Sequence, residues 1–164
     1  MAHEYRATVK WKRDGGVKFT DQRYSRAHRW SFDGGIEVPA SSSPLSVRLP
    51  YSVAEAVDPE EALVAALSSC HMLTFLYVAA KHGFVIDAYA DEAVGEMTKN
   101  DAGQMWVSKI TLNPAITFSG GKRPTPEQLD TLHHLAHEEC YIANSIKSEV
   151  VVNGAMSFAS AEGA

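Results

Sequence analysis

One stretch constrains the fold of this chain more than any other: residues 62–80 form 19 consecutive positions without a formal charge. That length is the minimum for a helix that crosses a membrane. The centre of the stretch reads Ser68-Ser69-Cys70-His71, which is polar for a lone membrane span. We therefore expect no membrane association, and instead a helix that is buried nearly all round inside a globular or dimeric core.

Two helices have start signals in the sequence. Asp58, Pro59 and Glu61 approximate an N-cap, a first helical position and the third residue of a capping box. Because Gly83 is a natural terminator, the first helix is predicted over residues 59–82. The second signature is Thr125, Pro126 and Gln128, and it predicts a helix over residues 126–139. Its apolar stripe consists of Leu129, Leu132, Leu135 and Ala136.

The remaining segments have the alternating pattern of half-buried strands. Strands are predicted over residues 5–12, 28–32, 36–38, 84–98, 104–118 and 149–158. Helices segregated from mostly antiparallel strands make the class α+β, with an antiparallel sheet packed on two helices. We find no internal repeat and no domain boundary, so residues 1–164 are predicted to form a single domain.

Charge and the N-terminal sequence bear on location and partners. The chain has 15 Lys and Arg against 20 Asp and Glu, a net charge of −5, which argues against broad nucleic-acid binding. Residues 1–10 contain no apolar region typical of a signal peptide, so we expect a cytoplasmic protein. Two cysteines in that compartment are reduced unless they take part in redox chemistry.

The two cysteines, Cys70 and Cys140, are open to two readings. Free cysteines are commonly small buried core residues, and neither belongs to a Cys-x-x-Cys motif. Alternatively, the two thiols meet and act on peroxides, which requires one of them to be a thiolate. Because an apolar helix raises the pKa of a thiol, a reactive Cys70 needs a nearby arginine, itself held by a carboxylate.

Two motifs resemble one family. Residues 58–70, DPEEALVAALSSC, and residues 136–145, AHEECYIANS, resemble the two cysteine motifs of the osmotically inducible protein C and organic hydroperoxide resistance (OsmC/Ohr) superfamily. The order of predicted elements agrees along essentially the whole chain. The resemblance implies the OsmC-like fold, an intertwined homodimer with sites at its interface, and a thiol peroxidase that reduces organic hydroperoxides in oxidative stress defence.

The resemblance also implies roles for single residues. Cys70 matches the cysteine that attacks the hydroperoxide, Cys140 the resolving cysteine that closes a disulfide, and Glu60 the carboxylate that positions the arginine. The arginine comes from the N-terminal strand region, where Arg26 is the first choice and Arg29 and Arg13 are the alternatives. The disulfide is then reduced by a dithiol, of which a lipoylated protein is one example. This chemistry requires no metal or organic cofactor.

The spacing of Glu60 and Cys70 adds a point of its own. Ten residues on one straight helix span about 15 Å along its axis. Glu60 is therefore badly placed to serve the Cys70 of its own helix. Either the helix breaks, or each site takes Glu60 from a second subunit. We accordingly expect a homodimer.

Two other functions compete with the peroxidase. His133 and His137 are four residues apart and Cys140 follows three later, so one helix face offers three candidate zinc ligands. The other alternative is a non-catalytic stress or binding protein on the same OsmC-like fold, because a fold does not fix a function.

Overall fold

The computed structural model describes residues 2–159. Within these residues the chain forms two compact units, which divide between Ala62 and Leu63. The single domain over residues 1–164 stays a prediction. The elements confirm the predicted α+β class, with two α-helices and three small sheets in the described residues.

The first unit contains an antiparallel sheet of three strands in the order β1-β2-β3. The strands are β1 (Ala7–Lys10), β2 (His28–Phe32) and β3 (Glu37–Ala40). In the register, Trp30 of β2 lies opposite Val9 of β1 and Val38 of β3. β1 differs from the prediction in two respects: the strand is shorter than residues 5–12, and all four of its residues are exposed rather than half-buried.

Helix α1 (Pro59–Lys81) begins as the capping signature predicts. The Asp58 carboxylate accepts from the Glu61 backbone N–H at 2.8 Å, and the Glu61 carboxylate accepts from the Asp58 N–H at 3.3 Å. The single chain buries only one face of the helix rather than its whole circumference. The buried residues recur at helical spacing: Leu67, His71, Phe75, Val78 and Ala79. By length and composition alone α1 is able to span a membrane, but its buried face belongs to the core of the second unit.

The sheet strands of the second unit are shorter than predicted. The segment 84–98 divides into β4 (Val85–Asp91) and β5 (Val94–Lys99), and 104–118 into β6 (Met105–Leu112) and β7 (Pro114–Ser119). The segment 149–158 divides in the same way into β8 (Glu149–Val152) and β9 (Ala155–Phe158). The strand orders are β4-β7-β9 and β5-β6-β8. β8 and β9 pair in parallel with β6 and β7, so the sheets are mixed rather than purely antiparallel.

Side-chain hydrogen bonds hold the breaks between these strands together. Asp91, at the end of β4, accepts from the Asn113 backbone N–H at 2.7 Å and from the Ser68 hydroxyl at 2.5 Å. Asn153 contacts the same residue, since its side-chain amide donates to the side-chain oxygen Oδ1 of Asn113 at 3.2 Å. The three strand breaks therefore lie at one level, and Ser68 ties α1 to them.

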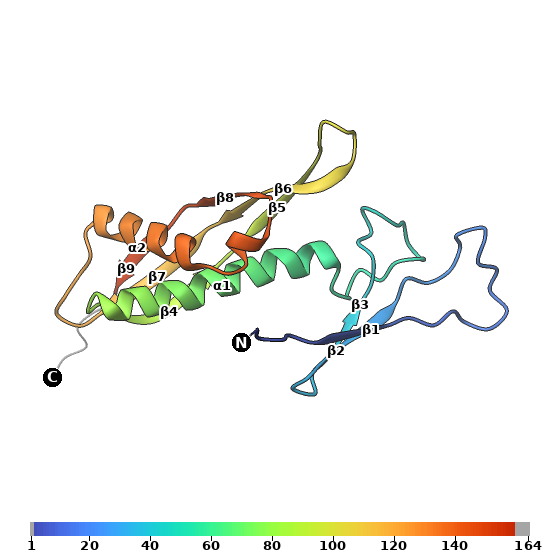
Figure 1. Ribbon diagram of the computed structural model, residues 1–164, viewed down its shortest axis with the longest axis horizontal. Coiled ribbons are helices and arrows are strands. Elements are labelled where there is room, and N and C mark those ends of the chain that lie inside the picture. The colour runs from blue at the N-terminus through green and yellow to red at the C-terminus, as the bar shows by residue number, and fades with distance from the viewer. Residues whose placement is uncertain (1, 160–164) are drawn as a thin grey trace. The chain divides into compact units, whose positions relative to one another are not determined.

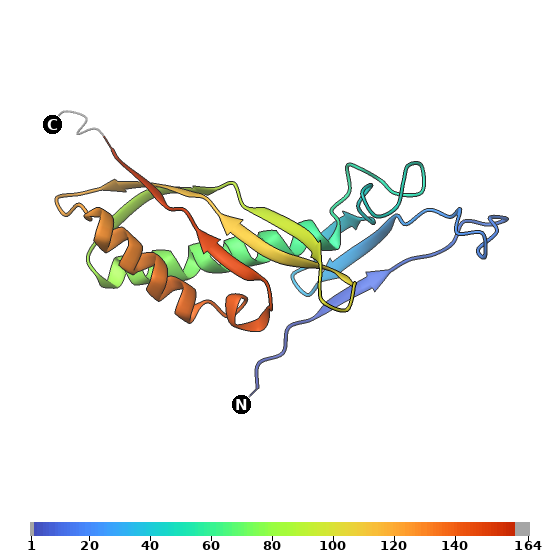
Figure 2. The ribbon, with the colours of Figure 1, turned by 90° about the horizontal axis from the view of Figure 1, so that it is seen from above.

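Helix α2 (Pro126–Glu139) has the complete capping box that the sequence predicts, with Thr125 and Gln128 bonded reciprocally. A short 3-10 turn, η1 (Ala143–Ser145), follows it. In the second unit α1 and α2 lie side by side on one face of the strands (Figures 1 and 2). Two hydrophobic clusters form there. One centres on Phe75, Phe118 and Leu132, and the other on Leu67, Ile110, Leu112 and Cys140.

Candidate thiol site

Cys140 is the C-cap residue of α2 and is fully buried. Its Sγ accepts a hydrogen bond from the Ala143 backbone N–H at 3.4 Å. The Asn144 side chain holds the turn by donating to the carbonyls of Glu138 at 2.9 Å and Cys140 at 3.1 Å. The chain therefore fixes this thiol by bending directly after the helix.

Cys70 lies near the middle of α1 and is half-buried. Its side chain packs against the cluster of Leu67, Ile110, Leu112 and Cys140. The fold thus brings two cysteines that are 70 residues apart in the sequence into one hydrophobic cluster, and both are free thiols.

The surroundings of the two thiols are unequal. The pKa of Cys140 is raised to about 11, first by burial and then by the neighbouring Cys70 side chain, while the Ala143 N–H acts in the opposite direction. Cys140 is consequently a protonated thiol at neutral pH. Cys70 is the more accessible of the two, which suits it to meet a reagent from solution.

Glu60 stands in the first turn of α1, where its side chain is half-buried. Its pKa is raised, first by burial and then by the carboxylate of Asp58, against the lowering effect of a backbone hydrogen bond. Within residues 2–159, no ion pair joins Glu60 to an arginine. The predicted Glu60–arginine pair is therefore not formed within the described chain.

Arg26 is held by its own loop. Its Nη1 donates to the carbonyls of Gln22, at 2.6 Å, and Tyr24, and its guanidinium lies 3.9 Å from the centre of the Tyr24 ring. Gln22 has a φ of 62°, in the left-handed region that few residues other than glycine adopt. By contrast, Arg29 makes only an exposed 3.8 Å pair with Glu37, and Arg13 lies in the exposed segment after β1.

A buried histidine pair is the feature that sequence reasoning missed. His71 Nε2 lies 3.1 Å from His133 Nδ1, and the two rings stack with centroids 5.4 Å apart. Burial lowers the pKa of each to about 4. A signal was present in the sequence, because His133 stands four residues after Leu129 and three before Ala136, within the apolar stripe of α2.

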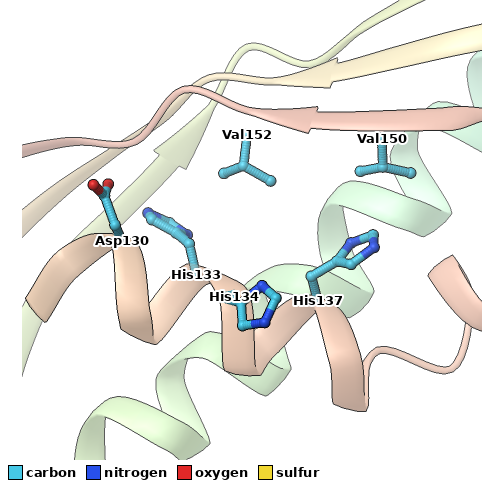
Figure 3. A pocket seen from close by; sticks show the side chains of 6 residues that line it. All are labelled: Asp130, His133, His134, His137, Val150 and Val152. Atoms are coloured by element: carbon cyan, nitrogen blue, oxygen red, sulfur yellow. The ribbon is translucent and has the colours of Figure 1, made fainter. Parts of the chain in front are cut away.

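The zinc alternative finds no support in this geometry. Among residues 2–159, no three His, Cys, Asp or Glu side chains gather as a metal site. His133 Nδ1 is already paired with His71, and Cys140 packs in the separate hydrophobic cluster of Leu67, Ile110 and Leu112. Figure 3 shows an open hollow between α2 and β8 instead, with histidines on one side and valines on the other. It is lined by Asp130, His133, His134, His137, Val150 and Val152.

Known proteins resemble the chain along nearly its whole length. A family model described as OsmC-like protein matches residues 52–154. An OsmC-like protein of unknown function from Vibrio cholerae is 53% identical, with a TM-score of 0.90, and the match covers 93% of this chain and 99% of that one. No curated protein matches the sequence.

More distant structures share the fold. An organic hydroperoxide resistance protein from Elizabethkingia anophelis is 17% identical with a TM-score of 0.66, over 97% of this chain and all of that one. The organic hydroperoxide resistance protein OhrB of Bacillus subtilis is 19% identical with a TM-score of 0.56, over 93% of this chain and 98% of that one. At these identities the likeness concerns the fold alone.

Proposed function

Because this chain belongs to the OsmC-like protein family, we propose that it is a thiol-dependent peroxidase that reduces organic hydroperoxides in oxidative stress defence. The observation that carries the proposal is the placement of Cys70 and Cys140 in one cluster with unequal surroundings. An accessible thiol beside a buried, protonated one is the arrangement that a peroxidatic and a resolving cysteine need.

In the proposed reaction the Cys70 thiolate attacks the terminal oxygen of the hydroperoxide. The S–O bond forms as the O–O bond breaks, and the alkoxide leaves as an alcohol after taking up a proton. Sulfur is oxidised to the sulfenic acid and the peroxide is reduced. The Cys140 sulfur then attacks the Cys70 sulfur, so that an S–S bond forms and hydroxide leaves with the Cys140 proton as water. A dithiol reductant restores both thiols and becomes a disulfide itself.

Arg26 is the proposed cation for Cys70, because a fixed positive charge favours a thiolate and stabilises charge on the departing oxygen. Its guanidinium is restrained by two carbonyls and an aromatic ring, whereas Arg29 has only a loose, exposed partner. Glu60 is the proposed carboxylate that completes this arrangement.

The proposed assembly is a soluble cytoplasmic homodimer. α1 exposes an uncharged stripe of apolar or small residues that recur at helical spacing: Ala66, Ser69, Leu73 and Tyr77. Leu73 is 61% exposed and Tyr77 56%, which is unusual for large apolar side chains in the middle of a long helix. A second copy of the chain covers this stripe in the proposed dimer. For the dithiol that reduces the disulfide, a lipoylated protein is one candidate.

Hydroperoxide consumption tests the proposal. The purified protein, supplied with dithiothreitol and cumene hydroperoxide, is expected to turn over, and Cys70→Ser to abolish turnover, while Thr131→Ser on the exposed side of α2 leaves it intact. With hydroperoxide alone, the mass of the wild type should fall by two hydrogens as the disulfide closes. Cys140→Ser should instead gain one oxygen, as the trapped sulfenic acid. If Cys70→Ser consumes hydroperoxide like the wild type, the non-catalytic alternative replaces this proposal.

A further inference from the structure

The two helices of the second unit meet through an apolar contact and one polar one. Phe75, Val78 and Ala79 of α1 share a cluster with Leu129, Leu132 and Ala136 of α2. Apolar packing is non-directional and so does little by itself to fix how far one helix is shifted along another. Of the side-chain hydrogen bonds within residues 2–159, His71 to His133 alone joins α1 to α2.

The ring of His133 is confined on more than one side. The ring of Phe75 stacks on it at 4.4 Å between centroids. A Cβ atom placed on Gly154 would lie 2.3 Å from His133 Nε2, so the glycine between β8 and β9 is required for the imidazole to occupy this place. The second nitrogens of the pair, His71 Nδ1 and His133 Nε2, are buried without a hydrogen-bond partner.

The histidine pair is close in sequence to both thiols. His71 directly follows Cys70 on α1 but buries its side chain against α2. His133 precedes Cys140 by seven residues, about 10 Å or two turns along α2. Any slide or rotation of α2 on α1 therefore moves the Cys140 thiol relative to Cys70, and also breaks the hydrogen bond between two buried imidazoles.

We propose that the His71–His133 pair, closed in by Gly154, is a positioning device that fixes α2 on α1 and so holds the Cys140 thiol against Cys70. The proposed role is one of positioning, and it gives neither histidine a step in the chemistry. The relevance of the histidine pair to catalysis rests on the proposed function. Its positioning effect can be measured separately, from how readily Cys70 and Cys140 form a disulfide.

Equilibration with glutathione disulfide measures the positioning without a hydroperoxide. In this exchange the protein dithiol becomes a disulfide and one glutathione disulfide becomes two glutathione thiols, so electrons balance. The equilibrium constant reports how well the fold places Cys140 against Cys70. We expect His133→Phe to lower it by about ten-fold or more, since small displacements of reacting groups have large effects. His134→Phe, on the exposed side of the same helix, is the matched control and should leave it unchanged.

A second pair of variants separates the hydrogen bond from the volume of the rings. In the double variant His71→Gln/His133→Asn, the amides take the places of Nε2 and Nδ1, so the bond is retained and the equilibrium constant should return to within about three-fold of the wild type. If His133→Phe fails to fold, Gly154→Ala provides the same test with both histidines present, because the new methyl group displaces the His133 ring.

The inference is overturned if folded His133→Phe or Gly154→Ala closes the disulfide with the wild-type equilibrium constant. It is equally overturned if the double variant is as impaired as His133→Phe. The proposed function has a separate readout, the oxidation of wild-type Cys70 by cumene hydroperoxide. Its failure would leave the glutathione result standing, so the two failures are distinguishable.

Discussion

The sequence offers three arginines as the cation for the Cys70 thiolate: Arg26, Arg29 and Arg13. They differ in how the chain restrains their side chains. Arg26 is bonded to the carbonyls of Gln22 and Tyr24 and lies over the Tyr24 ring. The left-handed backbone of Gln22 is a local strain, and strain of this kind tends to persist where a functional group is being held. A guanidinium that is already fixed loses little entropy when it meets an anion, which favours Arg26 over the loosely paired Arg29.

Arg26→Ala should accordingly slow oxidation of Cys70 by cumene hydroperoxide by about 100-fold, which is the usual effect of removing one preorganised donor from a developing charge. The rate is measured from single-turnover formation of the sulfenic acid in a Cys140→Ser background. Arg29→Ala is the matched control and should stay within about two-fold of the wild type. A large loss in Arg29→Ala together with a wild-type rate in Arg26→Ala would transfer the role to Arg29.

The His71–His133 pair between α1 and α2 makes the free energy of unfolding depend on pH. The unfolded imidazoles titrate near pH 6.5, whereas burial lowers the folded pKa of both to about 4. At His71 the charges of His133 and, to a smaller extent, His137 add to the effect of burial in lowering the pKa, and Asp91 opposes them. Between those two values the unfolded chain binds more protons than the folded one, so stability is fully present above about pH 6.5 and is lost as the pH falls towards 4.

In urea unfolding, the midpoint should therefore fall as the pH is lowered from 7.5 to 4.5. The free energy of unfolding should fall by at most about 1.4 kcal/mol per pH unit for each imidazole. The double variant His71→Gln/His133→Asn, which cannot take up these protons, should have a flatter profile. His134→Gln, which removes an exposed histidine, should keep the wild-type slope. Equal slopes in all three proteins would show that the buried pair does not control the acid limb.

Local patterns predicted the helices well and the strands less well, for a physical reason. The capping boxes at Asp58 and Thr125 are contained within four residues, so both helix starts were readable from the sequence and are confirmed. The strand breaks at Asn113 and Asn153 depend on hydrogen bonds between residues 40 apart in the sequence. The parallel pairing of β8 with β6, and of β9 with β7, likewise depends on the return of the chain through α2. The alternation of residues within a strand does not predict this return.

In the candidate site, too, some residues could be predicted from the sequence and others could not. Family resemblance identified Cys70 and Cys140, and the structure packs both side chains in one cluster. Sequence reasoning missed the histidine pair because the one histidine of α1, and His133 among the three histidines of α2, are interpreted as packing residues or metal ligands until the helices are docked. A partner for Glu60 was unpredictable from one chain, since ten residues of helix separate it from Cys70 by about 15 Å.

At the scale of the whole molecule, the exposed stripe on α1 is the feature that a single chain leaves unexplained. Its members are apolar or small, and Leu73 and Tyr77 are more than half exposed. In a mildly acidic chain with a net charge of −5, an uncharged face of this length is a poor solvent surface and a good dimer core. The 19-residue uncharged stretch is thus explained if one face packs in its own chain and the other against a second copy.

The double variant Leu73→Asp/Tyr77→Asp should convert the protein from dimer to monomer, because it places two charges on each of the two stripes that meet. Light scattering at micromolar concentration measures the mass, and circular dichroism checks that the monomer is folded. Thr131→Asp, which adds a charge to the exposed side of α2, is the control and should leave the dimer intact. A wild-type protein of monomeric mass would contradict the dimer outright. Peroxidase activity should disappear together with the dimer, since a site that borrows Glu60 from its partner is incomplete in one chain.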